Sequence, residues 1–249
     1  DQVREVKEKY GALAFPVCSI AVSKTKNREA RECGVSIINA IETIFHGLGK
    51  GIFRRNILVL GCRGNIGRSL VRDLAFKTYE GTLMGVDIRA DQPLDCPGDF
   101  EKIDFIEKTK IDEIPQERFF NLDLIIGSVG KSILKKDLIE KLILYGKKQY
   151  LYFASGSTKT SEYQDLLIWL QECVSNKKIS DYSVDISINS IKDHQTGVIQ
   201  GNRVRLVFED KEKKLPHPIK DIYLLADLTP INFLYYGVPA EIIDEVLLQ

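Results

Sequence analysis

The fold is decided by residues 56–70, which read Asn56-Ile57-Leu58-Val59-Leu60-Gly61-Cys62-Arg63-Gly64-Asn65-Ile66-Gly67-Arg68-Ser69-Leu70. The first five residues suit a buried parallel strand, the glycines interrupt it with a turn, and apolar residues then recur at helical spacing. A strand, a glycine turn and a helix in this order form a phosphate cradle. The first amides of the helix point toward the turn, and the helix dipole places partial positive charge there.

An acidic residue follows at the spacing that a dinucleotide-binding unit requires. A second apolar strand, residues 82–86, ends on Asp87, twenty residues after Gly67. A carboxylate at this position accepts hydrogen bonds from the adenosine ribose hydroxyls. The glycines read G-x-x-G-x-x-G rather than the standard G-x-G-x-x-G, and the alternative is a plain tight turn with a surface aspartate. We expect the cofactor to contact Gly61, Cys62, Arg63, Gly64, Asn65, Ile66, Gly67, Asp87 and Ile88.

The expected cofactor is NAD rather than NADP, because the Asp87 carboxylate repels a 2′-phosphate. Arg89, two residues further on, could offset that repulsion. Arg63 could contact the pyrophosphate or could be an ordinary surface arginine.

Composition excludes several other classes of function. Lys plus Arg and Asp plus Glu both number 35, so no basic field attracts nucleic acid or an anionic membrane. No apolar run approaches the length that spans a bilayer. The five cysteines are widely spaced without a C-x-x-C pair, which favours free thiols in a reducing cytoplasm. The three histidines lie far from any paired cysteines, so no metal site is expected.

Strands alternate with helices along the central part of the chain. Strands are expected at 122–127 and 149–154 and helices at 28–48, 134–145 and 160–174, with Asn27 as the cap of the first helix; segment 100–119 is open between strand and helix. This alternation predicts an α/β fold with a Rossmann-like, doubly wound parallel sheet. The ligand then lies over the carboxyl ends of the strands. Further cofactor contacts are therefore expected at Ser128, Val129, Gly130, Ala154 and Ser155, although an ordinary strand–helix loop is the alternative.

The C-terminal part changes to short alternating patterns. A hairpin elaboration is expected at about 183–209, with Gly201-Asn202 as its turn between 198–200 and 204–208. A further strand is expected at 221–227 and a closing helix at 239–248. Residues 1–22 are interpreted as an N-terminal linker or partial segment, and residues 23–249 as one Rossmann-like NAD-binding domain.

Four segments resemble the cofactor-binding domain of the S-adenosyl-L-homocysteine hydrolase family. They are Ser23-Lys24-Thr25-Lys26, the glycine turn Cys62–Arg68, Ala154-Ser155-Gly156-Ser157 and the strand Tyr223–Asn232. The similarity runs from about residue 15 to 249 with sparse identities. The resemblance implies tightly bound NAD, which in that family oxidises the 3′ carbon of the substrate ribose, with Lys26 near the reacting sugar.

The chain also departs from that family at positions that carry chemistry. The family's Asp-Asn pair falls on Ala30 and Arg31, its nicotinamide-side Asn on Ala154 and its following His on Ser157. The family's C-terminal lysine-tyrosine tail has no match before Gln249, and its preceding substrate domain has no counterpart among these 249 residues. Oxidation of a secondary alcohol needs a base and groups that hold the sugar, so the resemblance implies the cofactor more directly than the reaction.

Two hypotheses follow from the sequence. In the first, the chain is an NAD-dependent oxidoreductase-type enzyme for an unidentified small molecule, with Lys26 as catalytic residue. In the second, it is a non-catalytic dinucleotide-binding module of a larger protein or complex, and Lys26 is a solvated lysine beside a helix start. A homodimer or a missing N-terminal domain is possible in either case. We expect a cytoplasmic protein without nucleic-acid or membrane partners.

Overall fold

The computed structural model describes residues 8–11, 24–78, 80–90, 105–156 and 160–225. The chain forms two compact units, one of residues 1–29 and 234–249 and one of residues 30–233. The described part of the first unit is a helical turn at 8–10 and the start of helix α2 (Lys24–Gly47). The second unit holds the sheet.

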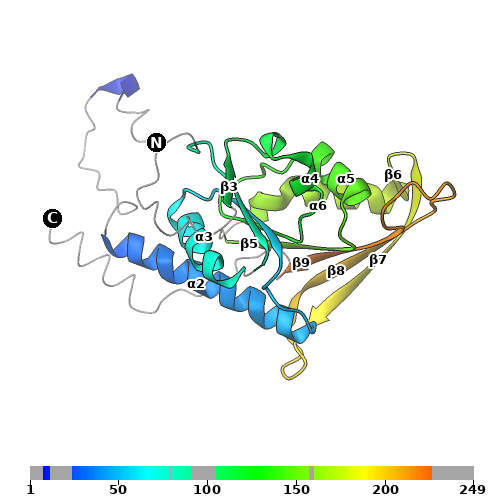
Figure 1. Ribbon diagram of the computed structural model, residues 1–249, viewed down its shortest axis with the longest axis horizontal. Coiled ribbons are helices and arrows are strands. Elements are labelled where there is room, and N and C mark those ends of the chain that lie inside the picture. The colour runs from blue at the N-terminus through cyan, green and yellow to red at the C-terminus, as the bar shows by residue number, and fades with distance from the viewer. Residues whose placement is uncertain (1–7, 12–23, 79, 91–104, 157–159, 226–249) are drawn as a thin grey trace. The chain divides into compact units, whose positions relative to one another are not determined.

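Within the described residues, nine strands form one sheet in the order β3-β2-β1-β4-β5-β9-β8-β7-β6 (Figure 1). The strands are β1 (Asn56–Leu60), β2 (Thr82–Val86), β3 (Phe105–Lys108), β4 (Leu124–Gly127), β5 (Tyr150–Ser155), β6 (Lys178–Ile179), β7 (Tyr182–Lys192), β8 (Ile199–Phe208) and β9 (Ile219–Leu225). Segment 105–108, which the sequence left open, is therefore a strand.

Six of these strands run parallel and define the fold. Strand β1 pairs in parallel with β2 on one side and β4 on the other, and the parallel pairing continues to β3 and through β5 to β9. The order 3-2-1-4-5-9 reverses its direction of winding between β1 and β4, which is the topological switch point of a Rossmann-like sheet. The α/β doubly wound fold predicted from the sequence is confirmed.

Helices cover both faces of the parallel sheet (Figure 1). Helices α2 and α3 (Asn65–Lys77) pack on one face, around a cluster that includes Ile41 and Phe45 of α2 and Leu70 and Leu74 of α3. The other face carries α4 (Gln116–Phe119), α5 (Lys136–Tyr145), α6 (Gln164–Asn176) and the short 3₁₀ helices η3 (Ile111–Glu113) and η4 (Thr160–Tyr163). Trp169 is buried in this second cluster, as its place in an apolar helix face predicted.

The hairpin elaboration is present, but its turn differs from the prediction. Strands β7 and β8 pair antiparallel and β8 continues antiparallel to β9, while Gly201-Asn202 lies inside β8. The turn is formed by residues 193–198 instead, because the Asp193 carboxylate accepts hydrogen bonds from the amides of Gln195 and Thr196 and fixes an Asx turn. The Gly-Asn pair was a misleading signal; the ladder has a register shift next to it, between Ile191 and Lys192.

Other expectations are corrected or fall outside the described residues. Helix α2 begins at Lys24, so Asn27 lies inside the helix and is not its cap. Most of the expected N-terminal linker at 1–22 and the expected helix at 239–248 lie outside the described residues, as does the family-like segment after Leu225. No helix in the described part of the chain has the length and apolar character needed to cross a membrane.

Candidate functional site

The glycine turn joins β1 to α3 at the switch point. Gly61 has φ +80°, and a Cβ there would lie 2.8 Å from Cγ2 of Val129. A Cβ at Gly67 would overlap the carbonyl group of Gly61, so this glycine lets α3 approach the end of the strand. Gly64 has φ −66°, and its Cβ would meet one atom, the oxygen of Gly61, at 3.3 Å. Packing therefore requires Gly61 and Gly67 to lack side chains, whereas the backbone at Gly64 could carry one.

The start of α3 supplies hydrogen-bond donors for an anion. Gly64 is the N-cap residue, its amide donates to Gly61 O at 3.0 Å, and the helical ladder begins with Arg68 N donating to Gly64 O at 2.8 Å. The amides of Ile66 and Gly67 in the first turn thus have no acceptor within the helix. Together with the helix dipole, they favour a negatively charged group at this point.

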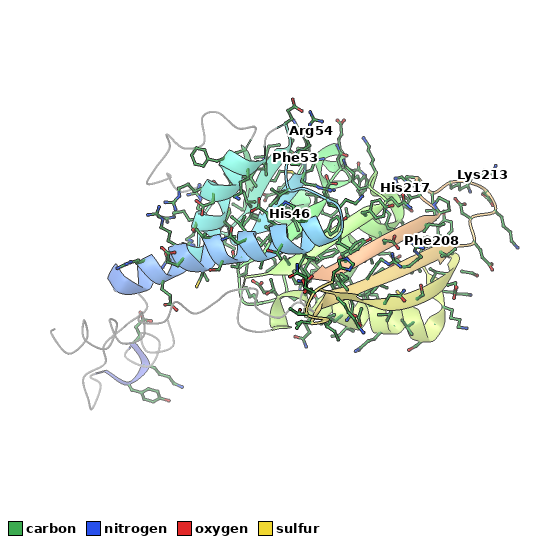
Figure 2. The ribbon with its side chains drawn as sticks, turned by 90° about the horizontal axis from the view of Figure 1, so that it is seen from below. His46, Phe53, Arg54, Phe208, Lys213 and His217 are labelled. Carbon is green, nitrogen blue, oxygen red and sulfur yellow. The ribbon has the colours of Figure 1, made fainter. Side chains whose placement is uncertain are left out.

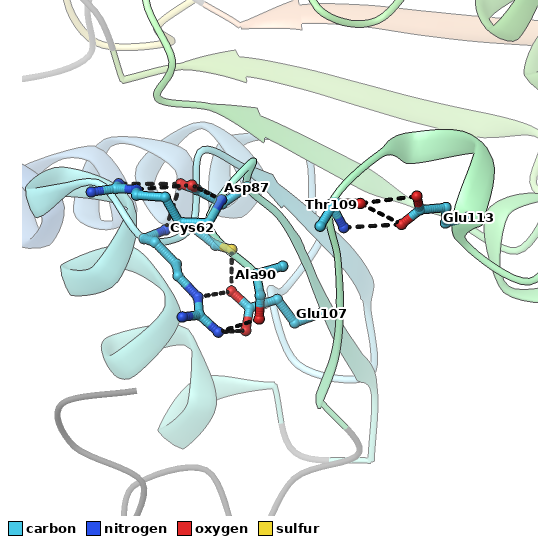
Figure 3. Close-up of polar contacts among 8 residues, drawn as sticks. Cys62, Asp87, Ala90, Glu107, Thr109 and Glu113 are labelled. Atoms are coloured by element: carbon cyan, nitrogen blue, oxygen red, sulfur yellow. Dashed lines mark hydrogen bonds and ion pairs between the residues drawn. The ribbon is translucent and has the colours of Figure 1, made fainter. Parts of the chain in front are cut away.

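Asp87 lies directly after β2 and joins the glycine turn (Figure 3). Its Oδ2 accepts from the Arg63 amide at 3.0 Å, and its Oδ1 accepts from the Arg89 amide at 3.0 Å and from Arg89 Nε at 3.2 Å. The Asp87 side chain is 7% exposed and that of Arg89 is 47% exposed. Burial raises the pKa of Asp87, but the hydrogen bonds from Arg89 and Arg63 outweigh it and lower the pKa below its ordinary value. The carboxylate is therefore ionised, and it is buried beside a half-exposed arginine.

Arg63 turns away from the helix start. Its Nε and Nη2 bind Glu107 of β3 at 2.5 and 2.6 Å, and Nη2 also donates to the carbonyl of Ala90 at 2.7 Å (Figure 3). The side chains of Arg63 and Glu107 are 9% and 12% exposed, so Arg63 is not a surface arginine. The Cys62 thiol also donates to Glu107, at 3.2 Å; burial and this carboxylate raise its pKa. The guanidinium thus holds β3 and the loop after β2 against the glycine turn and does not reach toward the amides of α3.

The loops after β4 and β5 form the other half of the site. The Ser128 hydroxyl donates to Leu60 O at 2.8 Å, which ties the loop after β4 to the glycine turn. Glu162, from η4, accepts from the amides of Val129 and Gly130 and from the Ser155 hydroxyl, the last two at 2.8 Å. This buried carboxylate therefore fixes both loops at the carboxyl edge of the sheet.

The pKa of Glu162 is raised, because burial outweighs the hydrogen bonds from Gly130, Ser155, Val129 and Gly156, which act to lower it. A Cβ at Gly127 would lie 2.7 Å from its Oε2, so the carboxyl group packs closely against the end of β4.

The expected cofactor residues lie on one edge of the sheet. Hydrogen bonds join the glycine turn, the loop at 87–90, Ser128 to Gly130 and Ser155. Ile88 is 86% exposed, whereas Ala154 and Ser155 are fully buried and offer no open side chain. Lys26 lies in the first turn of α2, in the other compact unit, and its side chain is outside the described part.

Sequence analysis missed two acids of this edge. Glu107 follows an apolar pair at the carboxyl end of β3, much as Asp87 follows β2, so the same signal could have found it. Glu162 stands between two strand-and-helix segments in a polar loop, and no spacing rule marks it. Both act by holding loops in place, which depends on long-range contacts that a local pattern does not contain.

The remaining candidates for chemistry lie elsewhere. His46 is exposed and His217 is half-buried (Figure 2). His217 Nε2 lies 2.7 Å from Lys147 O. The described residues contain no group of three or more His, Cys, Asp or Glu side chains arranged to hold a metal ion. Cys33, Cys62 and Cys173 are buried thiols.

No known family model matches the sequence, and no curated protein matches it. Solved structures with a similar fold include a dipicolinate synthase chain from Bacillus halodurans, at a TM-score of 0.41 and 14% identity over 69% of this chain and 52% of that chain. Another is the D-isomer specific 2-hydroxyacid dehydrogenase from Lactobacillus delbrueckii ssp. bulgaricus in its NAD complex, with a TM-score of 0.41 and 12% identity over 68% of this chain and 50% of that chain. A third is a dehydrogenase from Rhizobium meliloti, with a TM-score of 0.35 and 14% identity over 52% of this chain and 42% of that chain. This chain spans about half the length of these structures.

Proposed function

We propose that the chain binds an adenine dinucleotide, NAD, at the carboxyl edge between β1 and β4. The observation that carries this proposal is the glycine turn at the switch point, with the first amides of α3 on one side and the ionised Asp87 on the other. Two negatively charged phosphates suit the helix start, and two ribose hydroxyls suit a carboxylate at the end of β2.

The residues present fit such a ligand. A Cβ at Gly64 would meet one described atom within 4 Å, Gly61 O at 3.3 Å, and no side chain, so the diphosphate can approach the backbone there. The two ribose hydroxyls would replace the Arg89 side chain on Asp87, while the backbone amides of Arg63 and Arg89 keep their bonds to the carboxylate. Ser128, Val129 and Gly130 would line the nicotinamide side, on a loop that Glu162 holds in place.

An oxidoreductase-type activity on a small molecule is our first candidate for the reaction. When bound, NAD would supply hydride acceptance, and Lys26 would assist removal of a proton from a substrate hydroxyl. The resemblance to the adenosylhomocysteine hydrolase family motivates Lys26. A homodimer, or an additional N-terminal domain, would complete the substrate side.

A non-catalytic dinucleotide-binding module is the second candidate. The observation that favours it is the state of the last two residues of β5: Ala154 is fully buried, and the Ser155 hydroxyl donates to Glu162. Ala154 cannot take the place of the amide that the resembling family has there, and the position of that family's imidazole, Ser157, lies outside the described residues. The two candidates differ in whether bound NAD becomes reduced when secondary alcohols of nucleosides are added. If the chain is an enzyme, NAD is expected to be reduced and Lys26→Met is expected to abolish this reduction. If it is a non-catalytic module, NAD is expected to bind tightly without being reduced.

Titration calorimetry with NAD tests the binding itself. We expect Gly64→Asp to fold as the wild type and to lose NAD affinity by about a hundredfold or more, because a carboxylate beside a diphosphate costs several kcal/mol. Gly47→Asp is the matched control, since it adds the same side chain at a helical glycine where a Cβ meets nothing within 4 Å. Wild-type affinity of Gly64→Asp for NAD would refute the proposal that the diphosphate binds at the glycine turn.

A further inference from the structure

A groove lies outside the dinucleotide site and is lined by residues at the end of α2 and on strands β7, β8 and β9. It is a cavity of about 290 Å³. Its apolar lining includes Ile44 of α2, Leu48 directly after α2 and Ile191 of β7. Its polar lining includes Lys192 of β7, Asp193 of the turn and Arg203 of β8. None of the glycine-turn residues lines it.

The register of the sheet places Arg203 at the end of an aromatic row. Tyr152 of β5 pairs with Tyr223 of β9, which pairs with Arg203 of β8, which pairs with Asn189 of β7. The rings of Tyr152 and Tyr223 stack at a centroid distance of 4.7 Å, and Arg203 hydrogen-bonds Tyr223. Arg203 is thereby positioned on the groove wall by strand pairing and one tyrosine contact.

One donor of this guanidinium is left over. Arg203 Nε is buried and finds no acceptor among the residues that the structure describes. An N–H of a charged group without an acceptor costs more than about 1–3 kcal/mol. Arg203 as a whole residue is only partly buried, so we expect its side chain to reorient and donate to a group that binds in the groove. A single bridging water needs only about 10–15 Å³, and the groove is many times larger. The space accommodates a small organic molecule.

The charges of the groove select an anion. Two of its lining residues, Lys192 and Arg203, are cationic. Its lining also includes an acid, Asp193, whose Oδ1 accepts hydrogen bonds from the amides of Gln195 and Thr196 in the turn. The end of α2 carries the partial negative charge of a helix C-terminus, which would repel an anion. This repulsion is reduced because carbonyl groups of its last turn already accept hydrogen bonds from the amides of Leu48, Gly49 and Lys50.

We propose that this groove binds the oxyanion of a small organic acid through Arg203, with the apolar part of the ligand against Ile44 and Leu48. The oxyanion is a carboxylate or a phosphate monoester, since a guanidinium binds either with paired N–H donors. The site is independent of the dinucleotide.

Titrations of the full chain with benzoate, benzamide and inorganic phosphate test the proposal. Benzoate is expected to bind at least about tenfold more tightly than benzamide, which has the same shape without the charge, because a hydrogen bond to a charged group is worth about 1.5–3 kcal/mol. Tighter binding of phosphate than of benzoate identifies the phosphate form of the ligand, and the reverse identifies the carboxylate form. Equal affinities for benzoate and benzamide, or binding of neither anion, would overturn the proposal and leave water as the acceptor.

Variants locate the site. Arg203→Gln is expected to reduce benzoate affinity about tenfold or more, whereas Lys178→Gln, which removes the same charge from the exposed strand β6 outside the groove, leaves it unchanged. Leu48→Glu, at a partly exposed position of the apolar lining, places a repelling carboxylate there and gives the same loss even if Arg203→Gln fails to fold. Wild-type affinity in a folded Arg203→Gln or Leu48→Glu protein would contradict the assignment.

Discussion

At the scale of single residues, each of the three glycines of the turn has a different role. Gly61 has a positive φ, Gly67 lets the helix contact the end of the strand closely, and Gly64 is the position at which we propose that the diphosphate approaches the backbone. The sequence predicted that the three act together, because their spacing between a strand and a helix is local. The partners of Arg63 could not be predicted, since Glu107 lies on a strand that reaches it only after the sheet has formed.

The ribose role of Asp87 can be tested by cofactor discrimination. Asp87→Ala is expected to weaken NAD binding by about tenfold or more, because hydrogen bonds to a charged group are worth about 1.5–3 kcal/mol. The variant is also expected to show a smaller preference for NAD over NADP. Asp87→Asn, which keeps the shape, serves as the second variant. Calorimetric titrations of both cofactors give the ratio of affinities, and an unchanged ratio in both variants would rule out this role.

The ion pair between Arg63 and Glu107 is expected to contribute to stability as a unit. Arg63→Met leaves a carboxylate that is 12% exposed without its guanidinium and should cost about 3 kcal/mol of unfolding free energy. The double variant Arg63→Met/Glu107→Gln should lose less than the sum of the single variants, by about 1 kcal/mol or more. Urea unfolding completes the cycle, and strictly additive losses would show that the two side chains act independently.

At the scale of elements, the helices and parallel strands followed from apolar periodicity, but their ends depended on side-chain contacts. The hairpin turn shows why: Gly201-Asn202 has the right composition, yet Asp193 fixes the turn eight residues earlier. The end of α5 depends on a contact from β9. Lys220 is fully buried and its Nζ donates to Gly146 O at 2.9 Å, so a lysine from a distant strand caps the helix.

The Lys220 contact predicts a pH dependence of stability. Burial lowers the pKa of Lys220 from 10.5 to about 8, so between these values the unfolded chain binds more protons than the folded one. The unfolding free energy contributed by this group therefore rises with pH from about 8 to about 10.5, by roughly 3 kcal/mol. Cys62 and Tyr152 have raised pKa values and act in the opposite direction, so the wild type must be compared with Lys220→Met. A difference between the two proteins that is constant across this pH range would contradict the buried cationic cap.

At the scale of the whole sheet, the parallel, doubly wound architecture was predicted from the sequence, whereas the order of the strands came from the structure. A parallel doubly wound core with an antiparallel elaboration follows from alternating strands and helices and from period-two patterns near the C-terminus. Its functional consequence is geometric, because the switch point between β1 and β4 brings loops from 61–67, 87–90 and 128–130 to one edge. Which molecule reacts there depends on contacts that neither the strand order nor the glycine turn specifies.

The central claim is that a dinucleotide rests its diphosphate against the start of α3, and amide chemical shifts measured while NAD is added test it most directly. The account predicts that the largest changes occur at Gly64, Ile66 and Gly67, with a second group at Asp87 and Arg89, and that ADP-ribose reproduces both. Saturable changes confined to other parts of the chain, or no changes at millimolar NAD, would contradict it.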